Sequence, residues 1–104
     1  MNRKMRDMMV QARKMQSGMM KVQEELAAAS VEGTSGGGMV TAVVSGQGEL
    51  REIRISPEVV DPSDVEMLED LILAAVKDAV DRSRELARER MSGLGMPQGL
   101  GDLF

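Results

Sequence analysis

The sequence has no cysteine, histidine, tyrosine or tryptophan, and its single phenylalanine is the terminal Phe104. Without cysteine the chain can form no disulfide, zinc–thiolate site or redox thiol. Without histidine it lacks the commonest acid–base residue, so Ser–His and Cys–His catalysis are excluded. Without internal aromatic rings it cannot stack the bases of a single strand. The sequence therefore predicts a protein that is not an enzyme and needs no metal or cofactor.

Long hydrophobic runs are also missing. No stretch of the chain approaches the ~20 apolar residues that a membrane-spanning helix needs. The first six residues carry three basic groups instead of the apolar block of a signal peptide. We therefore expect a cytoplasmic protein without a membrane partner. Its 104 residues suffice for one domain, which we place at residues 1–93, followed by a flexible, glycine-rich tail over residues 94–104.

The formal net charge of −4 conceals a strong segregation of charge along the chain. Residues 1–23 carry six basic groups against one acid, whereas residues 61–81 carry seven acids against one lysine. Residues 82–91 are basic again, with four arginines against two glutamates. Such segregation decides which partners a surface attracts more than the total charge does.

Residues 2–29 are expected to form one long helix that begins at Asn2, a good N-cap residue. Apolar residues recur along it at the a and d positions of a heptad repeat. The helix would be about 42 Å long at 1.5 Å per residue, too long to bury against one small domain. We therefore expect part of its apolar row, the Met seam, to pack on a second copy of the chain. The Met seam consists of Met5, Met8, Ala12, Met15, Met19, Val22 and Leu26.

The basic residues of the same helix avoid the Met seam. With Met5 at heptad position a, none of the six falls at an a or d position, and most lie at the outward b, c and f positions. The helix therefore combines an apolar seam with a positive outer face. The six basic residues are Arg3, Lys4, Arg6, Arg13, Lys14 and Lys21.

The middle of the chain predicts a small antiparallel sheet. Three valines at positions 40, 43 and 44 favour a strand. The glycines at 36–38 supply a turn that needs a positive φ, and Gly46-Gln47-Gly48 supplies the next turn. Consecutive strands joined by short turns form a meander. The strands are expected at about residues 31–35, 39–45 and 50–55.

A second long helix is expected over residues 62–92. Ser63 with Glu66 fits a capping box, and Asp61-Pro62 offers an alternative entry. Acids are concentrated in the first turns of this helix and arginines in the last turns, which is the distribution that the helix dipole favours. Gly93 is expected to end the helix. Arg90 falls on the continuation of the apolar stripe, where burying it unpaired would be costly. We therefore expect the stripe to leave the core before Arg90 and the helix end to project.

Three other interpretations of these segments are weaker. The acid-rich helix start could hold a metal ion, but acids that complement a helix dipole explain it without one. The glycines at 33 and 36–38 lack the Lys-Ser/Thr of a phosphate-binding loop and lie between strands. A basic, methionine-rich helix could lie on a membrane or on an adaptable partner, but its apolar face lacks Trp and Phe. Helix packing is the simpler role for the methionines.

The positive helix face indicates a charged polymer as partner, although such a face is ordinarily just solvated surface. Two observations favour nucleic acid. The basic groups cluster with little acid among them, and Lys77, Arg84 and Arg88 fall within about 40° of one another on the second helix, at 100° per residue. Contacts to duplex phosphates need only charge and spacing. The predicted DNA-contacting residues are Arg3, Lys4, Arg6, Arg13, Lys14, Lys21, Arg84 and Arg88.

Several motifs follow one another along nearly the whole chain. They are Val31-Glu32-Gly33 with Gly36-Gly37-Gly38, Ile55-Ser56-Pro57-Glu58, and Asp64 through Met67-Leu68-Glu69-Asp70-Leu71-Ile72 with Ala74-Ala75. A Met- and Gln-rich N-terminal helix precedes them, and a Gly-Leu-Gly-Met-Pro segment follows. In this combination the chain resembles the YbaB/EbfC family of bacterial nucleoid-associated proteins.

The resemblance implies an α+β subunit with the order α-β-β-β-α, in which two long helices flank a three-stranded antiparallel meander. It also implies an intertwined, tweezer-like homodimer that binds double-stranded DNA through projecting helices, with low sequence specificity. Such a protein would reside in the nucleoid and contribute to nucleoid organisation and gene regulation. The resemblance identifies no individual DNA-contacting residues, so the candidate residues rest on the helical wheel.

The alternative function is a dimeric protein–protein interaction module. Its exposed seams would recruit another protein, and its basic face would be incidental. Salt distinguishes the two, because phosphate binding weakens steeply with salt and a seam-driven complex need not. Neither function involves a small-molecule substrate.

Overall fold

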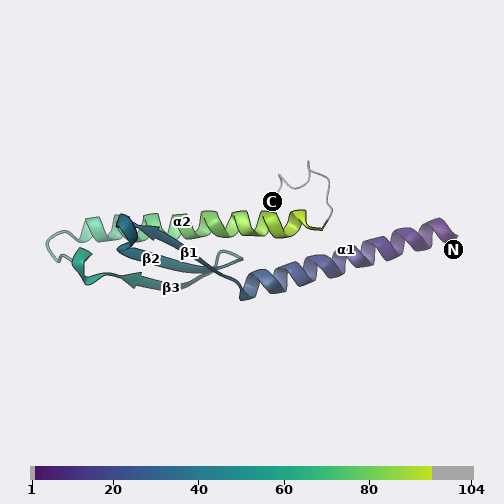
Figure 1. The fold of residues 1–104 in the computed structure, drawn as a ribbon, viewed down its shortest axis with the longest axis horizontal. Coiled ribbons are helices and arrows are strands. Elements are labelled where there is room, and N and C mark those ends of the chain that lie inside the picture. Colours follow the sequence, from purple (N-terminus) through teal and green to yellow (C-terminus); the bar gives the residue numbers. More distant parts are fainter. Residues whose placement is uncertain (1, 95–104) are drawn as a thin grey trace.

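The computed structural model describes residues 2–94 and shows two long helices attached to a small sheet (Figure 1). The helix–three strands–helix order confirms the predicted α+β class. Two short 3₁₀ helices, η1 and η2, flank β2 and β3. The elements are α1 (Arg3–Ala28), β1 (Ser30–Ser35), η1 (Gly36–Gly38), β2 (Val40–Ser45), β3 (Leu50–Ile55), η2 (Pro57–Val59) and α2 (Val65–Ser92).

The sheet is the predicted antiparallel meander, with the strand order β1-β2-β3. In its register, Ala42 of the central strand lies between Gly33 of β1 and Ile53 of β3. Gly36, Gly37 and Gly38 all have positive φ, which explains why the turn into β2 consists of glycine. β3 carries one additional residue opposite Val43 and Val44, a bulge that shifts the register near its start.

α2 lies across β1 and β2, and the main core fills the space between them (Figure 1). The helix approaches the sheet closely because small residues face each other. A Cβ atom added to Gly33 would lie only 2.6 Å from the carbonyl oxygen of Ala75 and the Cα atom of Ala79. The fully buried residues of this core are Val40, Ala42, Val44, Ala75 and Ala79.

A second, smaller cluster joins the two helices. Val22 and Leu26 of α1 are buried against Met91 near the end of α2. Arg90 also contacts α1, since its Nη1 donates a hydrogen bond to Oε2 of Glu25 at 3.0 Å. The prediction of a projecting α2 end is therefore wrong. It failed because the partner of Arg90 belongs to another helix, which the periodicity of α2 does not reveal.

The start of α2 also differs from the prediction. The helix begins at Val65, and the capping residue is Asp64, whose Oδ1 accepts a hydrogen bond from the backbone N of Met67 at 3.2 Å. Ser63 instead donates its hydroxyl to Oδ1 of Asp61 at 2.7 Å, so it does not form the expected capping box. This hydrogen bond, together with one from the Ser63 amide, lowers the pKa of Asp61. Ser63, the predicted capping residue, therefore binds Asp61 in the turn that precedes the helix.

Leu94 is the only residue of the predicted tail that lies within the described residues, and it packs on the α1–α2 cluster. The rest of that tail, residues 95–104, lies outside them. Across residues 2–94, no helix combines the length and apolarity needed to cross a membrane. The same part of the chain brings no three potential metal-ligating side chains together.

Candidate nucleic-acid interface

The N-terminal part of α1 is a helical arm that extends beyond the end of α2 (Figure 1). Residues 2–17 are all exposed, so we define the arm as residues 3–17. Its first turn is fixed by Asn2, as predicted, because Oδ1 of Asn2 accepts a hydrogen bond from the backbone N of Met5 at 2.9 Å. The arm spans about 22 Å at 1.5 Å per residue. It presents its side chains to any partner on nearly all sides.

The structure divides the Met seam at the base of the arm. Val22 and Leu26 are buried against α2, and Met19 is half-buried beside them, so this half of the seam is core. The other half is exposed, with 68 % of Met8 and 54 % of Met5 accessible to solvent. Exposed Met9 and Met20 widen the apolar surface, and the a/d spacing did not select them. The remaining exposed members of the seam are Ala12 and Met15.

The basic residues fall into two groups by their ion pairs. Of the 13 lysines and arginines, five on β3 and α2 have acidic partners. These paired residues are Arg51, Arg54, Lys77, Arg82 and Arg90. Within residues 2–94 no ion pair is formed by Arg3, Lys4, Arg6, Arg13, Lys14, Lys21, Arg84 and Arg88. The eight residues without acidic partners are the predicted DNA contacts.

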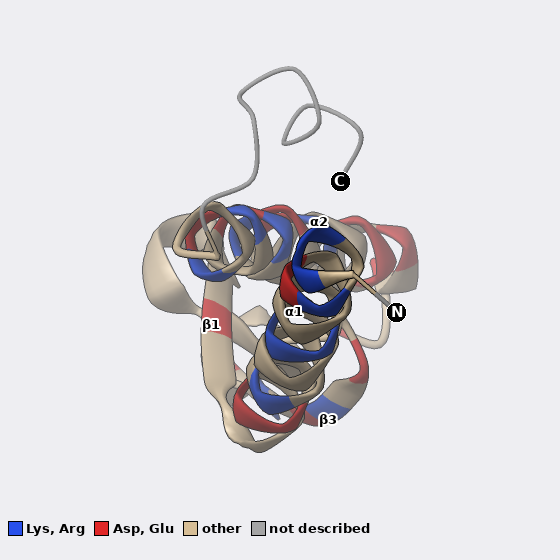
Figure 2. Ribbon diagram, turned by 90° about the vertical axis from the view of Figure 1, so that its right-hand side faces the viewer, with Lys and Arg blue, Asp and Glu red and all other residues tan. Residues whose placement is uncertain are grey.

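The unpaired cations of α1 lie mainly on one side of the helix. Viewed along the arm, Lys and Arg recur along α1, whereas acids are more frequent at its base and on α2 (Figure 2). Asp7 is the only acid in the arm. At 100° per residue, all of these cations except Lys4 fall within an arc of about 100° that faces away from Val22 and Leu26. Lys4 falls in line with Val22, on the side of α1 that faces α2 farther along the helix.

Arg84 and Arg88 lie on α2 in a more mixed electrostatic setting. They line a shallow hollow together with Asp81 and Glu85, so nearby acids reduce the positive potential there. Arg84 also borders the hollow between α1, the β2–β3 turn and α2, next to Gln23. These two arginines therefore form a separate and weaker positive surface than the arm.

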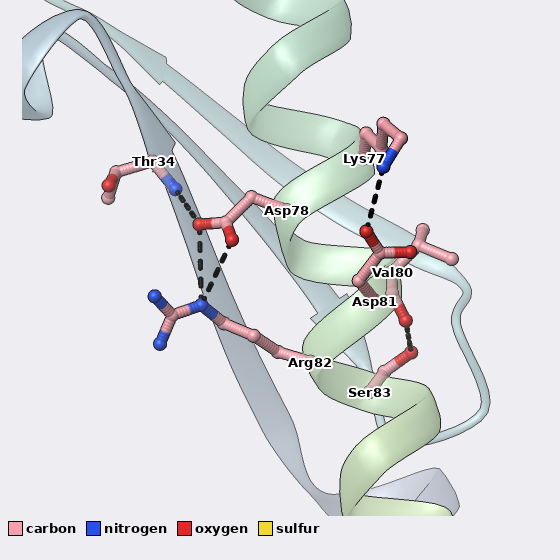
Figure 3. A network of polar contacts seen from close by, with 7 residues as sticks. All are labelled: Thr34, Lys77, Asp78, Val80, Asp81, Arg82 and Ser83. Atoms are coloured by element: carbon pink, nitrogen blue, oxygen red, sulfur yellow. Dashed lines mark hydrogen bonds and ion pairs between the residues drawn. The ribbon is translucent and has the colours of Figure 1, made fainter.

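One acid of α2, Asp78, joins the helix to the sheet. Oδ2 of Asp78 accepts a hydrogen bond from the backbone N of Thr34 at 2.9 Å, at the outer edge of β1 (Figure 3). Nε of Arg82 donates to Oδ1 of the same carboxylate at 3.2 Å. The Thr34 amide, followed by Arg82, lowers the pKa of Asp78. Lys77, which the helical wheel groups with Arg84 and Arg88, pairs with Asp81 at 3.0 Å. It is thus less available to an external phosphate.

Comparison with known proteins assigns the chain to a family. The sequence profile of the YbaB/EbfC DNA-binding family matches residues 1–99. The chain belongs to this family. Close YbaB/EbfC relatives carry the name nucleoid-associated protein. The relative from Saccharopolyspora erythraea is 52% identical over 103 residues, which cover 95% of this chain and 89% of that protein. The relative from Chloroflexus aurantiacus is 54% identical over 99 residues, which cover 95% of this chain and 97% of that protein.

A solved structure shares the fold. The crystal structure of an uncharacterized protein from Helicobacter pylori superimposes with a TM-score of 0.61 at 24% identity, covering 72% of this chain and 87% of that one. At this identity the likeness extends to the fold and not to individual side chains. The YbaB/EbfC family is a family of DNA-binding, nucleoid-associated proteins, and this chain is one of its members.

Proposed function

We propose that this YbaB/EbfC protein binds double-stranded DNA through the positive face of the arm, as a non-enzymatic homodimer with low sequence specificity. The observation that carries the proposal is the distribution of ion pairs. Within residues 2–94, five cations on β3 and α2 form ion pairs with acids, whereas the six cations of α1 form none. Unpaired cations on an exposed helix can neutralise phosphates without first breaking an internal pair.

The expected binding mode is electrostatic. Each neutralised phosphate releases counterions, so affinity falls steeply with salt, and non-specific dissociation constants lie around 10⁻⁴ to 10⁻⁶ M at physiological salt. Sequence reading would require side chains that reach base edges in a groove. No recognition motif such as a helix-turn-helix is evident within residues 2–94. We therefore expect unrelated duplexes to compete within about tenfold of one another, whereas specific repressors discriminate by 10³-fold or more.

Two features support a homodimer. The radius of gyration is 19.6 Å, whereas a compact chain of this length would have about 13 Å. Apolar side chains are also exposed in two places. One is the outer half of the Met seam. The other is β3, which α2 does not cover and where Leu50 and Ile55 are 50% and 36% accessible. A second copy would bury such surface and double every basic face. In an intertwined, tweezer-like dimer, two arms would straddle a duplex.

The cellular role follows from this mode of binding. A dimer with two arms and little sequence preference can occupy many sites along a chromosome and contact more than one phosphate backbone. We place the protein in the nucleoid, in the cytoplasm, where it would contribute to nucleoid organisation and gene regulation. The name shared by its relatives, nucleoid-associated protein, supports this role.

A charge reversal tests the proposal. Changing Arg6, Arg13 and Lys14 to glutamate should abolish most DNA binding in a mobility-shift titration. The three side chains are exposed and point away from Val22 and Leu26, so folding should change little. Light scattering and helical circular dichroism should therefore match the parent protein. If the reversed protein binds duplex DNA as tightly as the parent, the basic face is only solvated surface.

The exposed methionines favour one alternative, a dimeric protein–protein interaction module. Met5 and Met8 are more than half accessible, and flexible thioether side chains suit adaptable protein contacts. In that case the charge reversal would leave function intact. Complex formation with the partner protein would also vary little between low and high salt.

A further inference from the structure

We infer that the β2–β3 turn and Arg51 form a collar that sets the direction of the arm. Gly46, Gln47 and Arg51 are therefore positioning residues for DNA binding, although none of them belongs to the positive face. The inference rests on the proposed function, because it takes the arm as the element that contacts DNA. The periodicity of helices and strands predicts no role for this turn beyond joining β2 to β3.

The connection between α1 and the sheet is very short. Only Ala29 separates the helix from β1, and it is extended, with φ −74° and ψ 149°. Its backbone N donates to the carbonyl oxygen of Leu26 at 3.2 Å. With no loop to absorb a change, the direction of α1 is decided by the contacts of its last turns.

The collar supplies hydrogen-bond donors to the end of α1. The backbone N of Gly46 donates to the Leu26 carbonyl at 2.8 Å, and Nη2 of Arg51 donates to the Ala27 carbonyl at 3.3 Å. Nε2 of Gln47 reaches the carbonyl of Gln23 at 3.4 Å. The last carbonyls of a helix lack partners within the helix and carry its negative dipole end. The collar satisfies two of them, and the positive charge of Arg51 complements that end.

Gly46 is required for space, not for an unusual backbone conformation, because it is not among the glycines with positive φ. A Cβ atom at this position would lie 2.6 Å from the carbonyl oxygen of Leu26 and 2.9 Å from its Cα atom. Both atoms belong to the backbone of α1, so they can give way only if the helix moves. The glycine thus lets the turn sit directly against the helix.

The turn itself is held rigidly by the sheet. Oγ of the buried Ser45 accepts hydrogen bonds from the backbone N atoms of Gln47 and Glu49, at 3.2 and 3.3 Å. Gly48 has φ +82° and donates its amide to the carbonyl of Ser45 at 2.9 Å. The collar is therefore a rigid extension of β2 and β3 that contacts α1.

α2 supports α1 through a separate set of contacts. Met91 packs on Val22 and Leu26, and Arg90 pairs with Glu25. α1 is thus fixed between the collar and α2 over its last turns, while residues 3–17 are all exposed. A small rotation at the base becomes a large displacement at the tip. Leu26 and Arg3 are about 35 Å apart along the helix, so a 10° tilt moves the tip by about 6 Å. That equals the width of the minor groove, about 6 Å.

Two collar variants and one matched control test the inference. Arg51→Gln removes the hydrogen bond to Ala27, and Gly46→Ala forces a Cβ atom against Leu26. Arg54→Gln is the control, because it removes the same charge from β3 but the contacts of Arg54 are to Glu32 and Glu52, not to α1. Arg51→Lys keeps the positive charge and a side-chain N–H donor group. The chain has no cysteine, so spin labels can be placed on two introduced cysteines without further changes.

The measurement combines a distance with an affinity. Labels on Gln11→Cys in the arm and Ala74→Cys on α2 report the arm direction, with labelled chain diluted in excess unlabelled chain. We expect both collar variants to shift or broaden the label distance and to weaken duplex binding. The expected weakening is about fivefold at 0.15 M salt for each phosphate that the displaced arm no longer neutralises, with the salt slope reduced by about 0.9. Arg54→Gln should match the parent in both, and Arg51→Lys should recover most of the affinity.

The outcomes separate this inference from the proposed function. An unchanged label distance in Arg51→Gln would overturn the collar. So would a changed distance with unchanged DNA affinity, because arm direction would then not matter for binding. If Gly46→Ala fails to fold, Arg51→Gln alone decides. If the reversal of Arg6, Arg13 and Lys14 leaves DNA binding intact, the proposed function fails, and the label distance still reports whether the collar directs the arm.

Discussion

Replacing Gly33 by alanine tests how closely α2 approaches the sheet. Alanine in place of a strand glycine ordinarily stabilises a protein by about 0.5–1 kcal/mol, because the unfolded chain loses freedom. Here the added Cβ would collide with the backbone of α2, including the carbonyl oxygen of Ala75 at 2.6 Å and the Cα atom of Ala79 at 2.6 Å. The contact should reverse the sign of the effect.

The size of the effect follows from the kind of atom that is struck. Overpacking a core typically costs about 1–3 kcal/mol, and backbone atoms of a helix cannot rotate away as a side chain can, so we take the upper value. After the entropic gain, a net loss of about 2 kcal/mol remains. A change of that size lowers the melting temperature of a domain of this length by about 8–16 °C.

Urea and thermal unfolding followed by circular dichroism provide the assay. Gly93→Ala is the matched control, because Gly93 has φ −66° and its added Cβ would lie 3.4 Å from the nearest backbone oxygen. We expect the control to stay within about 1 kcal/mol of the parent. A Gly33→Ala protein as stable as the parent, or more stable, would refute the close approach of α2 to β1.

Three further predictions concern other parts of the molecule. Replacing Met15 and Met19 by lysine should dissociate or unfold the proposed dimer, because unpaired charge is costly to bury; light scattering that still gives twice 11.3 kDa with parental stability would contradict it. Removing residues 95–104 should shift the melting temperature by no more than a few degrees, and a loss of many degrees would mean that the tail docks on the core. Asp78→Asn should destabilise the protein at neutral pH. The lowered pKa of Asp78 contributes stability that is present above its unfolded value of about 3.9 and is lost as the pH falls through the folded value. The free energies of unfolding of the parent and of Asp78→Asn should therefore converge as the pH falls below about 4. A difference that stays constant with pH would show that the charge of Asp78 does not stabilise the protein.

Local chemistry made most of the fold predictable. Asn2 caps α1, the glycine run turns β1 into β2, and the valines of β2 form the central strand. Each depends on residues within a few positions of one another. The failures involve partners that are distant in sequence or compete locally. The prediction that the end of α2 projects is wrong because the partner of Arg90, Glu25, lies 65 residues away in the sequence.

The candidate site was predictable to a similar degree. The pairing of Lys77 with Asp81 is an i,i+4 contact that the sequence permits, so its neutralisation could have been inferred. The pairing of Arg54 with Glu32 depends on the strand register, so it could not be inferred from the sequence. The collar on α1 was missed for the same reason, since nothing in the local sequence of Arg51 indicates that it reaches the carbonyl of Ala27.

The salt dependence of duplex binding tests the central claim most directly. Two variants with equal net charge should be compared with the parent by fluorescence anisotropy between about 50 and 200 mM salt. In one, Arg6, Arg13 and Lys14 become glutamine; in the other, the paired residues Arg54, Lys77 and Arg82 do. We predict that the first variant flattens the log–log slope by about 0.9 for each phosphate that is no longer neutralised, and that the second keeps the parental slope. Equal slopes for all three proteins would show that the unpaired cations of the arm do not bind DNA.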